Sequence, residues 1–285
     1  MARLCYNYYV IMRNCTRKVG IGRIFPGFPE SYGHTFGILR LNYTFRLVLF
    51  VMSDYGYIAR NFENLNREIA ALGEKYGRKI TLVCVTKSGT DEELVALVRA
   101  GAADIGENRP QELARRGRLL SDLGLFPRLH EIGNLQTNKV KTVLSASLIH
   151  SVGKLSLAEE ISKRAQTAGI SVPVLIEVNC AGEENKGGVS PEGAEELLLK
   201  IKELPGILPS GLMTMGPETE DGELLRPYFR KTRELFDYLN EKYGFYGGGT
   251  LSMGMTHSYK VAIEEGATLV RVGRKLFEKG ENQDV

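Results

Sequence analysis

The chain has 285 residues, of which 43% are hydrophobic and 25% charged, and its net charge is +3. This is the composition of an ordinary globular protein with one large domain or two small ones. No apolar run reaches the ~18 residues that a membrane-spanning helix needs. The four cysteines show no CxxC pair and no zinc-ligand spacing, so we expect a reducing, cytoplasmic location, no structural disulfide and no metal site.

The charge is unevenly distributed along the chain. Residues 1–51 hold seven Arg or Lys residues and one acid, so this segment is +6 and the remainder is −3. A mildly acidic body does not favour a nucleic-acid partner. Residues 1–51 also show no hydrophobic period, whereas periodicity begins directly after Met52. We interpret residues 1–51 as an atypical extension that is disordered or lies upstream of a true start at Met52; a transit peptide would be richer in serine.

The first predicted element is an amphipathic helix, because apolar residues recur every three or four positions, at Ile58, Phe62, Leu65, Ile69 and Leu72. The run "ITLVCV" is then typical of a parallel strand that is covered on both faces. Thr90 and Glu93 have the spacing of a capping box, which predicts a helix start. Ser190-Pro191 predicts another.

Strand-like and helical segments then alternate to the end of the chain. The eight predicted strands are Ile80–Val85, Ala103–Glu107, Arg128–Gly133, Ser147–Val152, Val172–Asn179, Ile207–Met215, Thr250–Gly254 and Thr268–Gly273. This pattern predicts a single-domain α/β fold over residues 52–285, a (β/α)8 barrel with an added N-terminal helix. A doubly wound open sheet is the alternative, but no GxGxxG or GxxxxGK[ST] motif supports a nucleotide-binding form of it.

In such a barrel the chemistry gathers where the strands end. The loops after the seventh and eighth strands commonly hold a phosphate, and Gly254 and Gly273 would let backbone N–H groups approach an anion there. Ser252 would add a hydroxyl and Arg271 a positive charge. Lys87 follows the first strand, and a lysine facing a phosphate site is the arrangement expected for a phosphorylated aldehyde held as a Schiff base.

Each of these residues also has a simpler interpretation. Lys87 can be a solvated charge at a strand end, and Arg271 can belong to an ion pair under the barrel rim. The two glycines can be ordinary turn residues. His130 and His150 are interpreted as hydrogen-bonded core or rim histidines rather than catalysts. The combined pattern favours the functional interpretation, because one geometry explains all the strand ends together.

Several long segments resemble the pyridoxal-phosphate homeostasis proteins, a single-domain group related to the N-terminal barrel of alanine racemase. They are "CVTKSGTDEELVALVRAGAADIGENRPQEL", "HEIGNLQTNKVK", "IHSVGKLSLAEEI", "IEVNCAGEENKGGVSPE", "GLMTMG" and "LSMGMTHSYKVAIEEGATLVRVGRKLFEKG". The resemblance extends from about Met52 to Gly280. It implies a barrel that binds pyridoxal 5′-phosphate (PLP).

The resemblance also implies roles for individual residues. Lys87 would form the Schiff base with PLP, and Lys186 would receive the cofactor transiently or guide it into place. Asn108 and Asn179 would line the ring. The "SMG" and "RVG" segments would form the phosphate cradle, with Ser252, Gly254, Arg271, Gly273 and the following Arg274.

The chain departs from the family pattern at three positions. Arg274 stands where the family usually has Ser or Thr, so one hydroxyl for the phosphate is replaced by a charge. Leu129 replaces an aromatic residue. Gly89 stands where the family often has a second lysine, which puts a secondary cofactor role for that position in doubt.

The sequence favours a carrier over an enzyme. A racemase of this type needs a second base, which two-domain racemases take from a C-terminal domain of a partner subunit, and the sequence ends twelve residues after Gly273. We therefore expect a monomeric PLP carrier or buffer without strong catalytic activity, whose partners are apo-enzymes and neither nucleic acid nor membrane. A PLP-dependent amino-acid racemase and a Schiff-base aldolase remain the alternatives.

Overall fold

The computed structural model describes residues 55–183 and 187–279, so the predictions made for residues 1–51 and for Lys186 fall outside it. The strands, each followed by helical segments, are β1 (Thr81–Val85), β2 (Asp104–Glu107), β3 (Arg128–Glu131), β4 (Leu148–Val152), β5 (Val172–Val178), β6 (Ile207–Thr214), β7 (Thr250–Ser252) and β8 (Leu269–Val272). Each predicted strand is present, and its ends lie within two residues of those expected.

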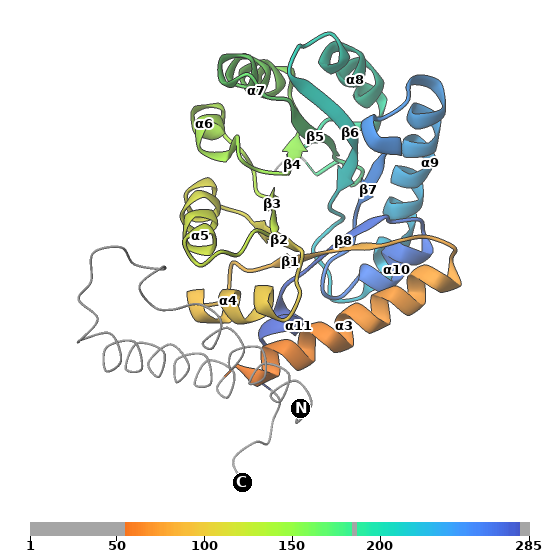
Figure 1. Ribbon diagram of the computed structural model, residues 1–285. Coiled ribbons are helices and arrows are strands. Elements are labelled where there is room, and N and C mark those ends of the chain that lie inside the picture. Colours follow the sequence, from red (N-terminus) through yellow and green to blue (C-terminus); the bar gives the residue numbers. More distant parts are fainter. Residues whose placement is uncertain (1–54, 184–186, 280–285) are drawn as a thin grey trace, which may run out of the picture. The chain divides into compact units, whose positions relative to one another are not determined.

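The strands form a barrel. They pair in parallel in the order β1 to β8, and β1 also pairs with β8, so the described part of the chain closes into an eight-stranded barrel (Figure 1). This confirms the predicted (β/α)8 fold and excludes the open doubly wound sheet.

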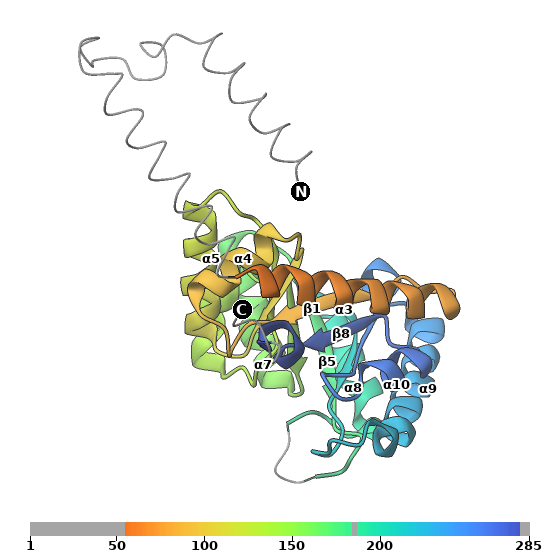
Figure 2. The ribbon, with the colours of Figure 1, turned by 90° about the horizontal axis from the view of Figure 1, so that it is seen from below.

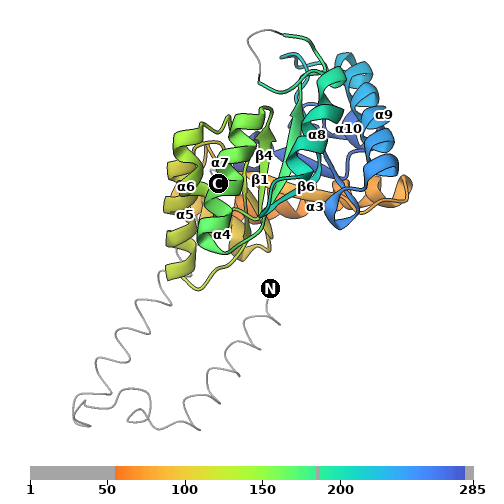
Figure 3. The same ribbon diagram turned by 90° about the horizontal axis from the view of Figure 1, so that it is seen from above.

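Helices surround the strands on all sides (Figures 1 and 3). They are α3 (Gly56–Lys75), α4 (Asp91–Arg99), α5 (Pro110–Asp122), α6 (Val140–Val143), α7 (Leu155–Ala168), α8 (Ala194–Lys202), α9 (Arg226–Tyr243), α10 (Tyr259–Glu264) and α11 (Arg274–Phe277). Short 3₁₀ turns occupy Thr137–Lys139, Pro191–Gly193, Gly222–Leu225 and Tyr246–Gly248. In the described residues no helix is both long and apolar enough to cross a membrane.

The predicted helix starts are confirmed. The side chain of Thr90 accepts from the N–H of Glu93, and the carboxylate of Glu93 accepts from the N–H of Thr90, which is a complete capping box at the start of α4. The hydroxyl of Ser190 accepts from the N–H of Gly193 at 3.2 Å. Both caps satisfy backbone donors that a helix start otherwise leaves without partners.

The added N-terminal helix α3 completes the outer layer. Its apolar face, with Ile58, Phe62, Leu65 and Ile69, is buried. α3 packs against α4, α10 and α11 and lies across β1 and β8 (Figure 2). Because α11 is only one turn long, it cannot cover this part of the barrel alone, and the long helix α3 supplies the missing cover.

The barrel interior begins with an apolar layer. Buried side chains from five different strands contact one another: Val83, Leu148, Leu175, Met213 and Leu269. Residues on opposite strands of a closed barrel can meet only inside it, so this cluster identifies the inward face of each strand. The layer closes the barrel as a packed core rather than a pore.

The next interior layer, towards the C-terminal ends of the strands, is polar. Side chains that face one way recur every second residue of a strand, so His150, Glu177 and Arg271 follow the apolar layer on β4, β5 and β8. All three are buried. The change from an apolar to a charged layer marks the C-terminal mouth as the end of the barrel that is built for polar chemistry.

Candidate functional site

Lys87 stands on a short turn at the mouth of the barrel. It follows β1 directly, and the N–H of Gly89 closes the turn by donating to the carbonyl oxygen of Thr86 at 3.0 Å. Val83 faces the interior, so the alternation of β1 turns Val85 inward as well, and Lys87 follows two residues later on the turn. Thr86 is buried whereas Lys87 is exposed, which leaves the lysine side chain open to incoming molecules.

Gly273 brings the end of β8 against the end of β1. A methyl group on its α-carbon would lie 2.9 Å from the carbonyl oxygen of Val85 and 3.3 Å from its Cβ. A side chain at Gly273 would therefore push the two strand ends apart. Since Val85 precedes Lys87 by two residues, the lysine turn and the β8 end are neighbours.

Gly254 holds the end of β7 at the same edge. Its φ of +91° is in the region that favours glycine, and an added methyl group would lie 2.5 Å from the Cβ of Ala262. The carbonyl oxygen of Gly254 accepts from the N–H of Arg271 at 3.0 Å, which joins the β7 and β8 ends. The structure thus brings Lys87, Gly254 and Gly273 to neighbouring strand ends.

Arg274 is the first residue of α11, and its side chain is exposed. Gly273 precedes it as the N-cap and has no side chain with which to cap the helix. The first N–H groups of a helix have no acceptor within it, so this end of β8 presents backbone donors and a cationic side chain. Both suit an anion.

Ser252 and Arg271 lie deeper, inside the barrel, and are bonded to each other. Nη1 of Arg271 donates to Oγ of Ser252 at 2.5 Å, and Nη2 donates to the carbonyl oxygen of Thr214 at 3.1 Å. Burial lowers the pKa of Arg271 to about 10, and the carboxylate of Glu177 opposes the shift. Arg271 therefore remains cationic at neutral pH and places a fixed positive charge beneath the mouth.

A chain of buried hydrogen bonds continues from Ser252 across the barrel. Nδ1 of His150 lies 3.1 Å from Oγ of Ser252, and Nε2 of His150 lies 3.0 Å from Nδ1 of His130. Nε2 of His130 lies 2.9 Å from Oδ1 of Asp104, whose other oxygen accepts from Arg128 at 2.6 Å. The prediction that both histidines are hydrogen-bonded core residues is confirmed.

One proton arrangement that satisfies every bond of this chain runs from Arg271 to Asp104. Arg271 can only donate, so Ser252 accepts from it and gives its own hydroxyl proton to Nδ1 of His150. Nε2–H of His150 then donates to His130, whose Nε2–H donates to Asp104. Burial above all, followed by the nearby His130 and Arg271, holds the pKa of His150 well below 6.5, so this ring is neutral at neutral pH. Sequence reasoning missed this chain.

Glu177 is a second residue that sequence reasoning missed. It is buried inside the barrel, and a methyl group on Gly187 would lie 3.2 Å from its Oε2. Burial raises the pKa of Glu177, and the charge of Arg271 opposes this shift. Its position two residues after Leu175 on a strand with continuous burial was the available signal.

The two predicted ring-lining amides lie at different strand ends. Asn108 follows β2 and is exposed, and the backbone of Gly133 is so close that an added methyl group would overlap the carbonyl oxygen of Asn108. Asn179 follows β5, and its Nδ2 donates to the carbonyl oxygen of Glu183 at 2.9 Å. Among the described residues, Oδ1 of Asn179 is buried without a partner and remains a free acceptor.

These residues fit the chemistry of a phosphorylated aldehyde. The mouth combines an exposed primary amine, two strand ends that carry Gly254 and Gly273, the backbone donors at the start of α11, and a buried guanidinium below them. An amine can condense with an aldehyde, and the donors and cationic charges suit a phosphate.

The sequence matches the family model "Alanine racemase, N-terminal domain" over residues 60–278. Among curated relatives, the pyridoxal phosphate homeostasis protein of Aquifex aeolicus is 45% identical over 223 residues, which is 77% of this chain and 95% of that protein. The protein of the same name from Helicobacter pylori is 36% identical over 203 residues, which is 70% of this chain and 88% of that protein.

Solved structures agree with this result. PipY of Synechococcus elongatus, solved with PLP bound, has a TM-score of 0.69 at 27% identity. The match covers 78% of this chain and 100% of the PipY chain. Alanine racemase of Clostridium difficile, in complex with cycloserine, has a TM-score of 0.60 at 17% identity. The match covers 82% of this chain and 62% of the racemase, and it supports the fold alone. The chain therefore belongs to the alanine racemase N-terminal-domain family and, within it, to the pyridoxal phosphate homeostasis proteins.

Proposed function

We propose that this protein binds PLP through a Schiff base to Lys87 and acts in PLP homeostasis. It would buffer the reactive aldehyde and pass it to apo-enzymes, without strong catalytic activity of its own. The observation that carries the proposal is the position of Lys87 at the barrel mouth, two residues beyond Val85, whose carbonyl oxygen abuts Gly273. The PLP in the PipY structure and the names of the curated relatives support it.

The remaining predicted residues take roles that follow from their positions. Backbone donors near Gly254 and Gly273, with the exposed charge of Arg274, would hold the phosphate. Ser252 and Arg271 would contribute from below, where their mutual hydrogen bond fixes the guanidinium. Asn108, Asn179 and the transfer residue Lys186 complete the proposal as the residues that line or deliver the cofactor.

We further propose that the protein acts in the cytoplasm as a monomer, with apo-enzymes as its partners. Delivery to a partner requires a cofactor site that another protein can reach. The exposure of Lys87 at the mouth supports this requirement.

The binding step is tested by titrating the protein with PLP and following the visible absorbance of a protonated imine. Lys87→Ala is expected to abolish the band. Lys154→Ala is the matched control, because Lys154 is also exposed and follows a strand, β4, at the same end of the barrel. A band that survives in Lys87→Ala would refute the covalent role of Lys87.

The homeostasis role is tested by mixing the PLP-loaded protein with an apo-enzyme and measuring recovered activity. A competing amine scavenges free PLP in the comparison sample. We expect the activity of the apo-enzyme to recover faster with the PLP-loaded protein than with free PLP under this competition. The racemase alternative is tested with L-alanine: production of D-alanine at ~1 per second or faster would favour an enzyme. Slow or undetectable turnover, together with cofactor transfer, is the outcome that the carrier proposal requires.

A further inference from the structure

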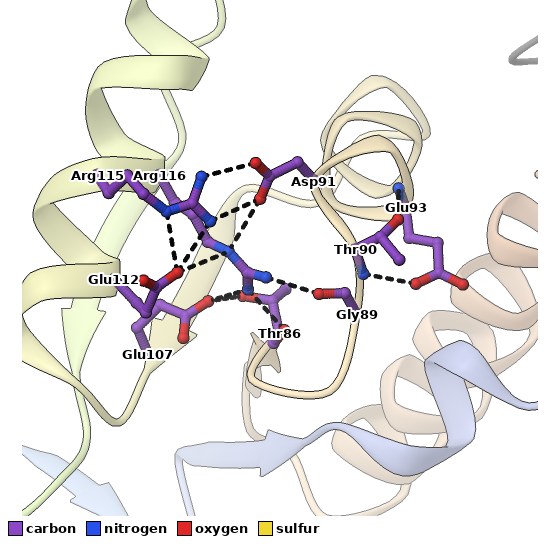
Figure 4. Close-up of polar contacts among 9 residues, drawn as sticks. All are labelled: Thr86, Gly89, Thr90, Asp91, Glu93, Glu107, Glu112, Arg115 and Arg116. Carbon is purple, nitrogen blue, oxygen red and sulfur yellow. Dashed lines mark hydrogen bonds and ion pairs between the residues drawn. The ribbon is translucent and has the colours of Figure 1, made fainter.

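A buried arginine of α5 holds the turn that carries Lys87 (Figure 4). Nη1 of Arg116 donates to the carbonyl oxygen of Thr86 at 2.7 Å, and Nη2 donates to the carbonyl oxygen of Gly89 at 2.6 Å. These carbonyls flank the two central residues of the turn, Lys87 and Ser88. One planar guanidinium therefore binds both ends of the lysine turn, residues 86–89. We call this pair of hydrogen bonds the clamp.

The guanidinium is in turn held by Glu107 at the end of β2. Nη1 of Arg116 lies 2.5 Å from Oε1 of Glu107, and the hydroxyl of Thr86 donates to the same carboxylate oxygen. Arg116 is 7% exposed and Glu107 is 2% exposed, so solvent does not compete with these bonds. A buried charge-assisted network of this kind fixes geometry strongly, because each member loses its partners if the turn moves.

The bonding pattern requires arginine chemistry. Two parallel donors on one rigid plane reach two separate carbonyls, whereas a lysine ammonium is a single point of charge on a flexible stem. The neighbouring Arg115 is 44% exposed and bonds Asp91 and Glu112 at the surface, as Figure 4 shows. Nε of Arg116 also lies 3.4 Å from Asp91 and 3.8 Å from Glu112, so the two arginines differ in burial and in the turn carbonyls that only Arg116 binds. The two adjacent arginines therefore divide into one that contacts the lysine turn and one that does not.

We propose that Arg116, supported by Glu107, is a positioning residue that orients Lys87 for covalent capture of an aldehyde. The inference rests on the proposed function. In the capture step the Lys87 amine and the aldehyde condense to form a C=N bond and release one water molecule. The water contains the aldehyde oxygen and both amine hydrogens. No oxidant or reductant is needed. Arg116 touches neither reactant and acts only through the two carbonyls that it fixes.

The test separates covalent capture from binding of the phosphate. Arg116→Lys keeps a positive charge beside Glu107, and Arg115→Lys is the matched control. Each variant is titrated with PLP and with pyridoxine 5′-phosphate, which has an alcohol in place of the aldehyde and cannot form the C=N bond. We expect Arg116→Lys to weaken PLP binding about tenfold and to leave binding of the alcohol unchanged, because one of the two carbonyl bonds is lost.

Three outcomes would overturn the inference. Wild-type PLP affinity in Arg116→Lys, or an equal loss for PLP and the alcohol, would show that the clamp does not act on capture. An equal effect of Arg115→Lys would show that the loss is not specific to the clamp. Failure of the proposed function looks different, because the wild-type protein itself would then show no Lys87-dependent absorbance band.

Arg116→Met, with Glu107→Gln to avoid a buried unpaired carboxylate, provides an independent check. Its melting temperature and the affinity of its folded form for the alcohol are measured beside its PLP affinity. Selective loss of the PLP affinity supports the clamp, and a parallel loss of both affinities contradicts it.

Discussion

Gly89 and Phe277 are in direct contact: a methyl group on Gly89 would lie 2.5 Å from Cε1 of the Phe277 ring. Gly89 belongs to the lysine turn, whereas Phe277 ends α11, the helix that begins after Gly273. The ring therefore packs the lysine turn against the β8 end of the site. It also accounts for glycine at this position, because a side chain here would meet the ring.

This contact predicts that Gly89→Ala destabilises the protein. The ring must shift to admit the methyl group, at a cost of about 1–3 kcal/mol in the free energy of unfolding. Urea denaturation of Gly89→Ala, Phe277→Leu and the double variant measures the coupling. We expect the alanine to cost less beside leucine than beside phenylalanine. Additive costs would show that the ring does not set the requirement for glycine.

Gly273→Ala is expected to weaken both the fold and the phosphate site. The added methyl group meets the backbone oxygen of Val85 at 2.9 Å, and backbone cannot move aside as a flexible side chain can. We expect a loss of about 1–3 kcal/mol in stability and weaker binding of pyridoxine 5′-phosphate, measured by urea denaturation and titration. Gly56→Ala in α3 is the control, since its methyl group has room and alanine favours helices. Unchanged ligand binding in Gly273→Ala would argue against a phosphate at this strand end.

Ser252→Ala is expected to cost about 1–3 kcal/mol of stability, because it leaves Nη1 of Arg271 and Nδ1 of His150 buried without a hydroxyl partner. The loss is measured by urea denaturation beside Ser156→Ala, an exposed serine of α7. A cost no larger than that of the control would mean that the buried chain is not continuous through Ser252.

Glu131 predicts a pH-dependent stability effect. Burial raises its pKa from 4.5 to about 7, the carboxylate of Glu107 adds to the shift and the N–H of Gly133 opposes it. The folded state therefore keeps the proton longer than the unfolded state does. The stability that this proton contributes is complete below pH 4.5 and is lost as the pH rises through about 7.

Replacing Glu131 by Gln removes this titration. We expect Glu131→Gln to gain ~2 kcal/mol relative to wild type on going from pH 5 to pH 8, measured by denaturant unfolding at both values. Glu159→Gln, at an exposed position of α7, is the control measured beside it. A difference between Glu131→Gln and wild type that is constant with pH would contradict the shifted pKa.

The sequence was sufficient to predict the barrel. Continuous apolar runs such as Val172–Val178 predict strands that are covered on both faces, and the alternation with amphipathic helices predicts parallel pairing. The strand-end rule then placed Lys87, Gly254 and Gly273 at one end of the fold. These predictions needed only local patterns and a general property of the fold.

The sequence was not sufficient to predict the buried polar contacts. Ser252 on β7 meets His150 on β4 across two intervening strands, β5 and β6, and which residues face each other inside a barrel depends on how the strands are staggered when the sheet closes. Arg116 could have been found: it shares the helical face of Leu113 and Leu120, so an arginine was present at an inward position. The adjacent Arg115 made the pair resemble a solvated charge run.

The covalent role of Lys87 is tested best by reducing the PLP-loaded protein with borohydride, digesting it and locating the modified lysine by mass spectrometry. Reduction makes the C=N bond permanent, so the label marks the residue that held the aldehyde. We expect the label on the peptide that contains Lys87. A label confined to another lysine, or a PLP-binding protein with no label at all, would contradict this role.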